Sequence, residues 1–419
     1  MESARPLRVR GLQASAEKPE EFSESRESGD NMRLPKRLGA HRLLRKHPRL
    51  QWCRETTTTM QNNIRRVLVC GGILGFLVLA MVSLAQLGAE KSSPVEWHVD
   101  AEHKKRVHEH VRRVLTGQCH PGSTRQSLMA RLPTSSHLTQ PFLWRDVPLT
   151  EDLFQYPPPF GFKGLQGKVE NLLKQLPDSA AQMEKSKECR RCVVMGNGGI
   201  LKGLELGQLI DKFDIIIRLN SGPLGEFSVD VGNRTSIRMS YPEGTPLQWV
   251  DTDSQTLFVA VVHKGGDISW TSAMINKHNT VPLWDRLFFW QKVPDQIPLE
   301  PERFRLLNPH VIRETALDLL KYLPPTQRLL GWDKNVPTLG VSALNLASLL
   351  CDEVSLAGFG YNLSQQGAPL HYYDHLTMSA MWRQKMHDVD RETQLLQNLV
   401  KDGTISDLTG GIHCSFCHS

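Results

Sequence analysis

Residues 189–220 constrain the fold more strongly than any other stretch of this chain. Apolar residues at 193–195 lead into a glycine-rich turn at 196–199, and a segment of helical character then leads to a second apolar stretch at 215–217. This succession of strand, glycine-rich turn, helix and strand is typical of a βαβ unit. Because the backbone N–H groups of such a turn can come close to a phosphate, the stretch predicts a nucleotide site beside its flanking cysteines.

The same alternation continues through the chain after residue 160. Strands that alternate with helices predict an α/β domain with a largely parallel sheet, in which ligands bind at the carboxyl ends of the strands. The predicted strands are 193–195, 214–218, 257–262, 304–307 and 354–357, and the predicted helices are 102–115, 167–175, 201–212, 311–322, 341–350 and 391–401.

The glycine-rich turn does not fit the common nucleotide motifs. A dinucleotide fingerprint requires a third glycine three residues after the second, and that position is Leu201. A P-loop requires a lysine and a hydroxyl residue directly after the turn, and neither is present. The turn therefore argues against a Rossmann oxidoreductase and remains compatible with a nucleotide that carries a single phosphate.

The N-terminal part of the chain predicts a membrane anchor behind a basic tail. Residues 67–87 carry no charge and are roughly 21 residues long, enough for a helix to cross a bilayer. Arg65 and Arg66 come directly before them, so the positive-inside rule places a disordered tail, 1–66, in the cytosol and the rest of the chain in the lumen. A cleaved signal peptide fits less well, because the apolar run begins late in the chain. Most of the basic excess belongs to the tail, so we expect no nucleic-acid binding.

The chain after the predicted anchor has features of a lumenal protein. Asn233 and Asn362 each begin a glycosylation sequon. Six cysteines follow the predicted anchor, where disulfides can form, and spacing alone does not choose among their fifteen pairings. Two of them, Cys414 and Cys417, lie at the C-terminal end and would pair with each other or with another chain.

The same part of the chain divides into three predicted regions. Residues 88–155 are polar and interrupted by prolines, so we expect a stem. A run of prolines at 157–159 cannot continue a helix and marks the start of a globular domain, 156–412. Residues 413–419 would be a short C-terminal extension.

Further chemistry-bearing stretches follow the glycine-rich turn. Val336-Pro-Thr-Leu-Gly340 begins a predicted helix, and a later predicted strand ends in Gly358-Phe-Gly360. Together they would form a second wall of a cleft at the carboxyl edge of the sheet. His371-Tyr-Tyr-Asp374 comes next, and after it the pair His387 and Glu392. A histidine is a suitable base for a sugar hydroxyl, although a single histidine is more often structural.

Taken in order, these stretches resemble the four motifs of the animal sialyltransferases, glycosyltransferase family 29. The resemblance covers residues 150–412. It implies a GT-A-like single Rossmann-type domain with an N-terminal transmembrane helix, in a type II Golgi membrane protein whose catalytic domain is lumenal. The large motif is similar to residues 192–238, the small motif to 337–361, the third motif to 371–374, and the very small motif to His387 with Glu392.

The resemblance implies a reaction and assigns residues to it. CMP-sialic acid would be the donor, and sialic acid would pass to the 3-hydroxyl of a terminal β-galactose with inversion at the anomeric carbon. His387 would act as the base on the attacking hydroxyl, and His371 would stabilise the departing phosphate. Glu392 would at most orient its loop. The implied donor-binding residues are Asn197, Asn220, Thr338, Gly340, Gly358, Gly360 and Tyr372.

Two disulfides are implied by the resemblance. Cys192 would bond to Cys351 and so join the two nucleotide-binding motifs. Cys119 would then bond to Cys189 and tie the stem to the globular domain. The alternative, in which Cys189 and Cys192 form half of a zinc site, lacks a second pair of ligands.

Two Asp-x-Asp pairs, at 251–253 and 388–390, have the pattern of the metal-binding pairs of many glycosyltransferases. The metal ion that such a pair holds neutralises a diphosphate, whereas CMP carries one phosphate, and the resembled family is metal-independent. We therefore expect no metal ion and no other cofactor.

The acceptor is predicted from other stretches. Tyr241-Pro-Glu-Gly and Leu287-Phe-Phe-Trp290 are similar to family members that use the glycolipid lactosylceramide, so lactosylceramide is the expected acceptor and a galactose-terminated glycoprotein glycan is the alternative. A homo-oligomer or a complex with other Golgi glycosyltransferases is a further expectation. The aromatic-rich residues 270–290 would either face lipid or ceramide or belong to the core.

Overall fold

The computed structural model describes residues 71–73, 75–77, 99–133, 138–181, 188–277, 280–324, 327–328, 331–332, 335–360, 367–383 and 386–417. They belong to two compact units, 1–90 and 91–419. In the first unit, 71–73 and 75–77 are helical and exposed. No helix among the described residues is long and apolar enough to cross a membrane, and most of the predicted anchor at 67–87 lies outside them.

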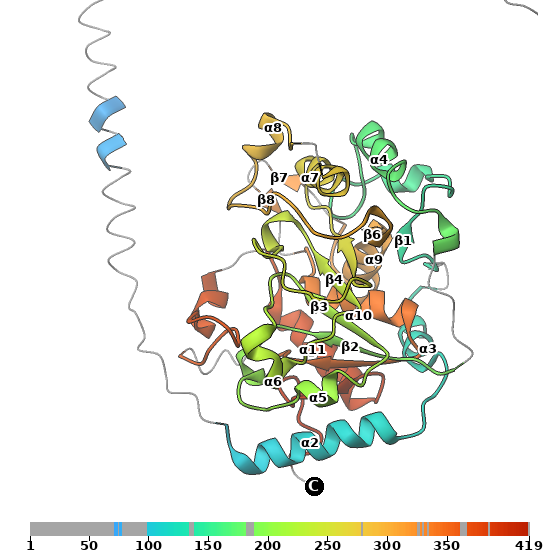
Figure 1. Ribbon diagram of the computed structural model, residues 1–419, viewed down its shortest axis with the longest axis vertical. Helices are drawn as coiled ribbons and strands as arrows, with labels where there is room; N and C mark the ends of the chain where they lie inside the picture. Colours follow the sequence, from blue (N-terminus) through green and yellow to red (C-terminus); the bar gives the residue numbers. More distant parts are fainter. Residues whose placement is uncertain are drawn as a thin grey trace, which may run out of the picture. The chain divides into compact units, whose positions relative to one another are not determined.

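The second unit is built around an eight-stranded sheet (Figure 1). The strand order is β1-β6-β5-β4-β3-β2-β9-β10, and within this described sheet only β1 runs antiparallel to its neighbour. The strands are β1 Phe142–Leu143, β2 Arg191–Met195, β3 Ile215–Leu219, β4 Ile237–Ser240, β5 Leu257–Ala260, β6 Phe304–Leu307, β9 Glu353–Ala357 and β10 Ser406–Asp407, and a separate antiparallel pair is formed by β7 Gln327–Arg328 and β8 Gly331–Trp332.

Helices of very different lengths surround this sheet. The α-helices are α2 Ala101–Thr116, α3 Ser123–Met129, α4 Gln166–Leu173, α5 Gly207–Ile210, α6 Ser228–Val231, α7 Gly265–Asn276, α8 Leu283–Arg286, α9 Pro309–Arg313, α10 Leu339–Leu350 and α11 Val389–Lys401. A π-helical segment, η7 Glu314–Leu319, continues α9. The 3₁₀ segments are η1 Glu151–Phe154, η2 Ser179–Ala181, η3 Gly199–Leu201, η4 Gly225–Phe227, η5 Pro242–Gly244, η6 Pro301–Arg303 and η8 Met378–Arg383.

Alternate residues of β2 point into two different cores. Cys192 and Val194 belong to a cluster that includes α10 and α11, whereas Val193 and Met195 belong to a cluster that includes α2. A third cluster packs α4 and α7 against β5 and β6. Because both faces of the sheet are covered, every residue of β3 and β4 is buried, as in parallel sheets generally.

The predicted α/β class with a mostly parallel sheet is confirmed, and each predicted strand is present. The predicted helix at 201–212 is wrong. Gly203 and Glu205 have φ values of +81° and +54°, which a right-handed helix does not allow, so only the short α5 forms there. Strand β4 is absent from the prediction because buried Arg238 interrupts its apolar pattern. Asp251 pairs with that guanidinium inside the core and makes its burial possible.

The folded unit begins earlier than the predicted domain start at residue 156. Val107 and Val111 of α2 are fully buried in the core, and Phe142 lies in the sheet opposite Leu307. Residues that the sequence assigns to a stem therefore form part of the globular unit, because the apolar stripe of α2 covers one face of the sheet.

Candidate active site

Three loops that follow neighbouring parallel strands meet at one edge of the sheet. Met195 at the end of β2 lies opposite both Arg218 in β3 and Ala357 in β9, so the three strands end together. Their loops and the starts of α10 and α11 line a cleft of about 610 Å³. The predicted site residues that line this cleft are Asn197, Asn220, Thr338, Gly340, Gly358, Gly360, His371 and His387.

The glycine-rich turn after β2 packs against the loop after β9. The N–H groups of Gly196 and Gly198 donate to carbonyl oxygens of that loop region at 2.8 and 3.0 Å, and the N–H of Gly199 donates to another backbone carbonyl at 3.1 Å. A Cβ at Gly196 or Gly198 would lie 2.4 or 2.6 Å from the Gly358 carbonyl oxygen, so only glycine permits this approach. Most N–H groups of the turn, which the sequence predicts to face a phosphate, are thus already hydrogen-bonded to backbone carbonyls. Asn197 is the polar residue that the turn contributes to the cleft.

Asn220 is held at the cleft by polar groups beneath it. Its φ of +52° is a left-handed conformation that asparagine tolerates. Its side-chain oxygen accepts from the Ser240 hydroxyl at 3.3 Å, and its carbonyl oxygen accepts from Arg238 Nη1 at 2.6 Å. The buried Arg238 is balanced by Asp251 at 2.7 Å.

A second buried guanidinium lies in the neighbouring strand. Arg218 donates to the backbone carbonyls of Val231 and Arg234, and it takes part in none of the described ion pairs. Burial, helped by the charge of Arg238, lowers the pKa of Arg218 to about 10, so it stays charged at neutral pH. Positive charge beneath this end of the cleft favours an anionic ligand. The sequence does not single out either arginine, because a charged residue is normally exposed and both of these are buried.

His371 lies beside the glycine-rich turn, with which it forms a β-bridge. Its Nδ1 is 2.7 Å from the Asp374 carboxylate, and its ring stacks on Tyr373 with centroids 5.2 Å apart, so the ring orientation is fixed. Tyr372 does not line the cleft. It is buried, its hydroxyl donates to the Pro223 carbonyl at 2.7 Å, and burial raises its pKa. It therefore supports this wall from behind.

His387 is positioned as a neutral imidazole. Its Nδ1 is 2.7 Å from the Val336 carbonyl oxygen. Since a carbonyl only accepts, Nδ1 carries the proton and Nε2 keeps its lone pair. Burial lowers the pKa of His387, and the hydrogen bond to Val336 opposes this shift only in part. The side chain is therefore in the form that a general base requires at neutral pH.

Glu392 joins α11 to the start of α10 across the cleft. Its carboxylate accepts from the Thr338 N–H at 2.7 Å and from the Thr338 hydroxyl at 2.6 Å, and burial raises its pKa to about 7. Gly340 follows in the first turn of α10, where a Cβ would lie 2.7 Å from the Phe359 ring. The role of Glu392 is therefore larger than the sequence suggests, because from α11 it holds Thr338, a cleft residue at the start of α10, in place.

The opposite end of the cleft contains residues that the sequence does not single out. Lys264 Nζ lies 2.7 Å from the carboxylates of both Glu243 and Asp267, and 5.0 Å from the centroid of the Trp290 ring. Burial raises the pKa of Asp267 to about 6. Lys264 follows β5 closely, so the rule that sites lie at the carboxyl ends of strands could have found it. The lining residues at this end are Tyr241, His263, Lys264 and Trp290.

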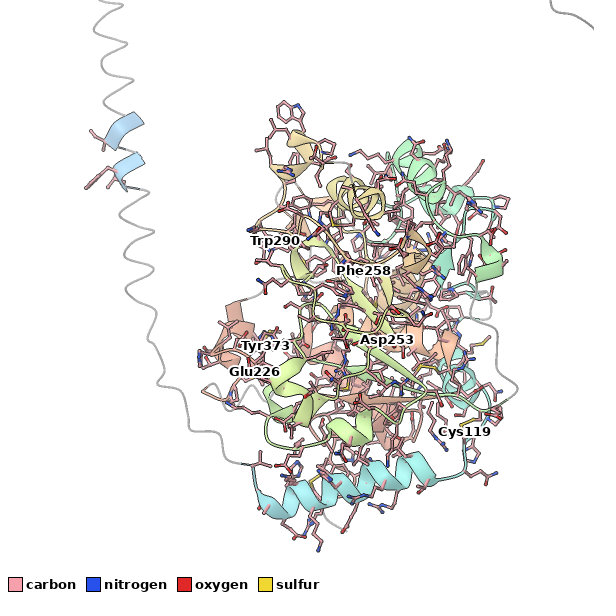
Figure 2. The ribbon with its side chains drawn as sticks, viewed as in Figure 1. Cys119, Glu226, Asp253, Phe258, Trp290 and Tyr373 are labelled. Atoms are coloured by element: carbon pink, nitrogen blue, oxygen red, sulfur yellow. A yellow bond between two sulfur atoms is a disulfide. The ribbon has the colours of Figure 1, made fainter. Side chains whose placement is uncertain are left out.

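Two disulfides fasten the site to the rest of the unit. Cys192 in β2 is bonded to Cys351 directly before β9, with Cα atoms 5.9 Å apart, so the bond joins the strands that carry the two glycine loops. Cys119 is bonded to Cys189 with the same Cα separation, and Figure 2 shows Cys119 at the far side of the sheet from Trp290. The structure thus has the two pairings that the family resemblance implies.

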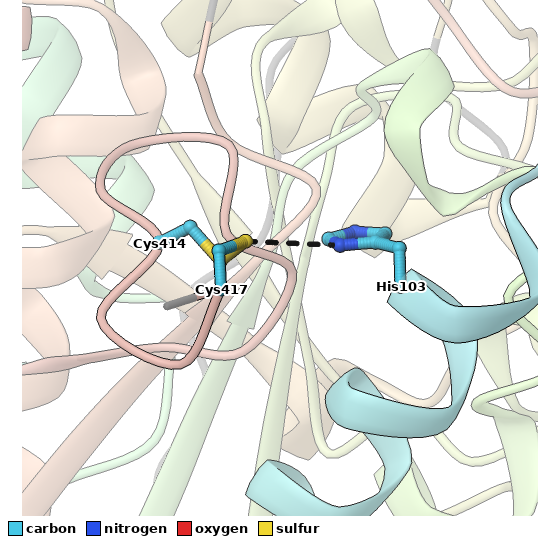
Figure 3. A group of neighbouring side chains, drawn as sticks. All are labelled: His103, Cys414 and Cys417. Atoms are coloured by element: carbon cyan, nitrogen blue, oxygen red, sulfur yellow. Dashed lines mark hydrogen bonds between the residues drawn. A yellow bond between two sulfur atoms is a disulfide. The ribbon is translucent and has the colours of Figure 1, made fainter. Parts of the chain in front are cut away.

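The C-terminal extension folds onto α2. Cys414 and Cys417 are bonded to each other, and Cys417 Sγ lies 3.9 Å from Nδ1 of His103 (Figure 3). The three side chains are close enough to surround a metal ion, but both sulfurs are used in the disulfide and offer no thiolate. Phe416 is buried and stacks on His110 with centroids 4.5 Å apart. The extension is therefore part of the fold.

One of the two predicted sequons lies among the described residues. Asn233 is exposed on the loop after α6, where a glycan can be accommodated. Asn362 lies outside the described residues.

The carboxyl edge of this parallel sheet carries glycine loops, two asparagines and two oriented histidines. Such a site is typical of a nucleotide-dependent group transferase. The sequence profile of glycosyltransferase family 29 (sialyltransferase) matches residues 142–404, and the chain belongs to this family. It is therefore a glycosyltransferase, as the four sequence motifs indicate.

Known relatives cover most of the chain. It is 44% identical over 371 residues to a lactosylceramide alpha-2,3-sialyltransferase of Rattus norvegicus (87% of this chain, 95% of the relative) and 45% identical over 376 residues to the protein of that name of Homo sapiens (88% and 90%). A CMP-N-acetylneuraminate-beta-1,4-galactoside alpha-2,3-sialyltransferase of Homo sapiens is 37% identical over 297 residues (71% and 78%). The crystal structure of a mammalian sialyltransferase in complex with Gal-beta-1-3GalNAc-ortho-nitrophenol shares the fold, with a TM-score of 0.51 at 23% identity over 67% of this chain and 93% of that chain.

Proposed function

We propose that this chain transfers sialic acid from CMP-sialic acid to the 3-hydroxyl of the terminal β-galactose of lactosylceramide, with inversion and without a metal ion. The observation that carries the proposal is identity of 44% and 45%, over most of the chain, to lactosylceramide alpha-2,3-sialyltransferases. The geometry supports it, because His371 and His387 line the same cleft as Asn197 and Asn220, which come from a distant part of the sequence.

In this proposal the donor occupies the end of the cleft formed by the glycine loops. Asn197 contacts the phosphate or ribose and Asn220 the ribose, above the buried charges of Arg218 and Arg238. Thr338 and Gly340 approach the cytosine or the donor carboxylate. Gly358 and Gly360 line this end of the cleft, but a Cβ at either would collide with Leu201 or Gly411, so they shape the loop and do not make room for the nucleotide as the sequence predicts.

The proposed transfer is a single displacement. The oxygen of the galactose 3-hydroxyl bonds to the anomeric carbon of sialic acid while Nε2 of His387 takes the hydroxyl proton. The bond from that carbon to the phosphate oxygen breaks, and CMP leaves with the electron pair. His371, oriented by Asp374, donates a hydrogen bond to the departing phosphate. Attack opposite the leaving group inverts the anomeric centre.

The proposal needs no metal ion, and the first aspartate of each Asp-x-Asp pair is hydrogen-bonded within the protein. Asp251 accepts from Arg238 and from the Thr235 hydroxyl inside the core. Asp388 caps α11 by accepting from the Arg391 N–H at 3.1 Å. Asp251 is committed to Arg238 inside the core, and neither Asp251 nor Asp388 lines the cleft.

The acceptor sugar is proposed to occupy the opposite end, beside Trp290 and Lys264. An aromatic face suits the apolar face of galactose, and charged groups suit its hydroxyls. The proposed setting is a GT-A-like, Rossmann-type domain in the Golgi lumen, held by an anchor at 67–87 with residues 1–66 in the cytosol. Disulfides such as Cys192–Cys351 are consistent with an oxidising lumen.

The test is an acceptor panel with labelled CMP-sialic acid. Lactosylceramide, free lactose and an asialo-glycoprotein are offered to the full chain, and sialylated lactosylceramide is expected as the main product. The second candidate is transfer to galactose-terminated glycoprotein glycans, which the 37% identical relatives favour. Preference for the asialo-glycoprotein would support this second candidate and refute the first.

A further inference from the structure

Five large apolar side chains on and just after α8 are exposed to solvent. Their exposed fractions run from 64% to 77%. In the described part of the 91–419 unit, other exposed large apolar residues are scattered along the sequence. Scattered apolar residues are ordinary, whereas a contiguous group marks a binding surface. We call this group the apolar rim, and it consists of Leu283, Trp284, Leu287, Phe288 and Trp290.

The core beneath the apolar rim holds it in place. Trp270 of α7 is fully buried, and its Nε1–H donates to a backbone carbonyl at 2.9 Å. Phe289 turns inward and packs against the same core. Asp285 of α8 forms an ion pair with Lys168 of α4 at 2.9 Å. The aromatic-rich stretch therefore has both roles that the sequence suggests, with Trp270 in the core and the rim residues outside.

The charges beside the apolar rim suit a lipid headgroup layer. Arg286 and Lys292 are exposed next to the rim, whereas the acidic residue of α8, Asp285, is already paired. Tryptophan prefers the boundary between hydrocarbon and headgroups, and arginine and lysine extend their charged ends into the headgroup layer, where phosphate oxygens accept hydrogen bonds. A short segment with apolar and cationic side chains together is typical of a surface that lies on a bilayer.

The apolar rim is continuous with the cleft. Trp290 belongs to both, since its ring lies 5.8 Å from that of Tyr241 and beside Lys264 within the cleft lining. Figure 1 shows α8 at the end of the unit opposite α2, and Figure 2 labels Trp290 toward this same end.

We infer that the apolar rim docks on the bilayer that contains the glycolipid acceptor and brings the cleft mouth to the membrane surface. The inference rests on the proposed function. Only two sugars separate the reacting hydroxyl of lactosylceramide from its ceramide, which stays in the bilayer. The acceptor end of the cleft must therefore come close to the membrane, and a tether alone does not orient it.

The first test compares a glycolipid with a soluble acceptor. The full chain is reconstituted in phosphatidylcholine vesicles with 10% phosphatidylserine, as wild type, as the rim variant W284S/L287S/F288S, and as the control M129S/V229S/L323S, which removes three exposed apolar side chains elsewhere. The rim variant is expected to lose about tenfold or more of its activity on vesicle-embedded lactosylceramide and less than about twofold on free lactose. The control should keep both activities. Equal glycolipid activity of the rim variant and the control would overturn the inference, and so would an equal loss on both acceptors.

The second test does not depend on the acceptor. Tryptophan fluorescence is measured in vesicles of brominated phosphatidylcholine for the wild type and for Trp284→Phe, so that the difference reports Trp284 alone. Stronger quenching of the wild type supports docking, and identical quenching overturns it. If the wild type used only the asialo-glycoprotein, the proposed function would fail, and this measurement would still decide whether the rim meets the bilayer.

Discussion

Replacing Glu392 by glutamine is expected to remove a pH-dependent loss of stability. The Glu392 carboxyl is 4% exposed and accepts hydrogen bonds from the Thr338 N–H and hydroxyl at 2.7 and 2.6 Å. Burial raises its pKa from 4.5 to about 7. The folded-state pKa of Glu392 lies above the unfolded-state value, so the folded state favours the protonated carboxyl. The contribution of this carboxyl to the free energy of unfolding is therefore complete below pH 4.5 and is lost as the pH rises through 7.

The size of this loss follows from the separation of the two pKa values. Each pH unit between them lowers the free energy of unfolding by about 1.4 kcal/mol. Between pH 5 and pH 8, Glu392 therefore lowers the free energy of unfolding by roughly 2 to 3 kcal/mol. Glutamine has nearly the same shape and does not titrate, so Glu392→Gln should lack this loss.

The assay is urea unfolding followed by circular dichroism at pH 5 and pH 8. It compares the wild type, Glu392→Gln, and Glu226→Gln, in which the same change is made at an exposed position. The wild-type free energy of unfolding, measured relative to Glu392→Gln, should fall by roughly 2 to 3 kcal/mol from the lower to the higher pH. If the two proteins respond equally to pH, the carboxyl does not titrate as its burial implies and the reasoning is refuted.

The remaining predictions concern catalysis, the core and the expected absence of a metal. His387→Ala should lower kcat by about 10²- to 10⁴-fold while CMP binding, followed by calorimetry, is retained; wild-type turnover would refute the base assignment. Arg238→Met should lower the free energy of unfolding by about 3–5 kcal/mol, because Asp251 is left buried without its cation; an unchanged urea midpoint would contradict this. Cys351→Ser should lower the free energy of unfolding by about 2–5 kcal/mol because the disulfide to Cys192 is lost, and an unchanged melting temperature would argue against this. EDTA should leave turnover unchanged, whereas a loss that manganese restores would show a metal requirement.

Much of the scaffold could be predicted because its determinants are local. Buried parallel strands are apolar along most of their length, so β2 and β5 are visible as the short apolar runs 193–195 and 257–262. The rule that ligands bind at the carboxyl ends of strands then places the loops containing Asn197 and Gly358 at one edge. The order of the four motifs identifies the family, and with it His371 and His387.

The burial and pairing of charged groups could not be predicted from local pattern. Strand β4 is not apparent from the sequence because Arg238 is charged, and charged residues are normally exposed. Only the fold shows that Asp251 lies beside Arg238 in the core and pairs with it. Lys264 and Glu243 form their ion pair between segments that follow different strands, so no spacing in the sequence reveals it.

The sequence by itself determined the α/β class, the positions of the main strands, the family motifs and the presence of a long apolar run near the N-terminus. Only the tertiary structure decided that the turn after β2 uses most of its N–H groups on neighbouring carbonyls, and that Trp270 is buried while Trp284 is exposed. The physical reason is that backbone propensity and apolar periodicity act over a few residues. The partner of a hydrogen bond or of a buried charge, and the side of the chain that faces water, depend on segments that only folding brings together.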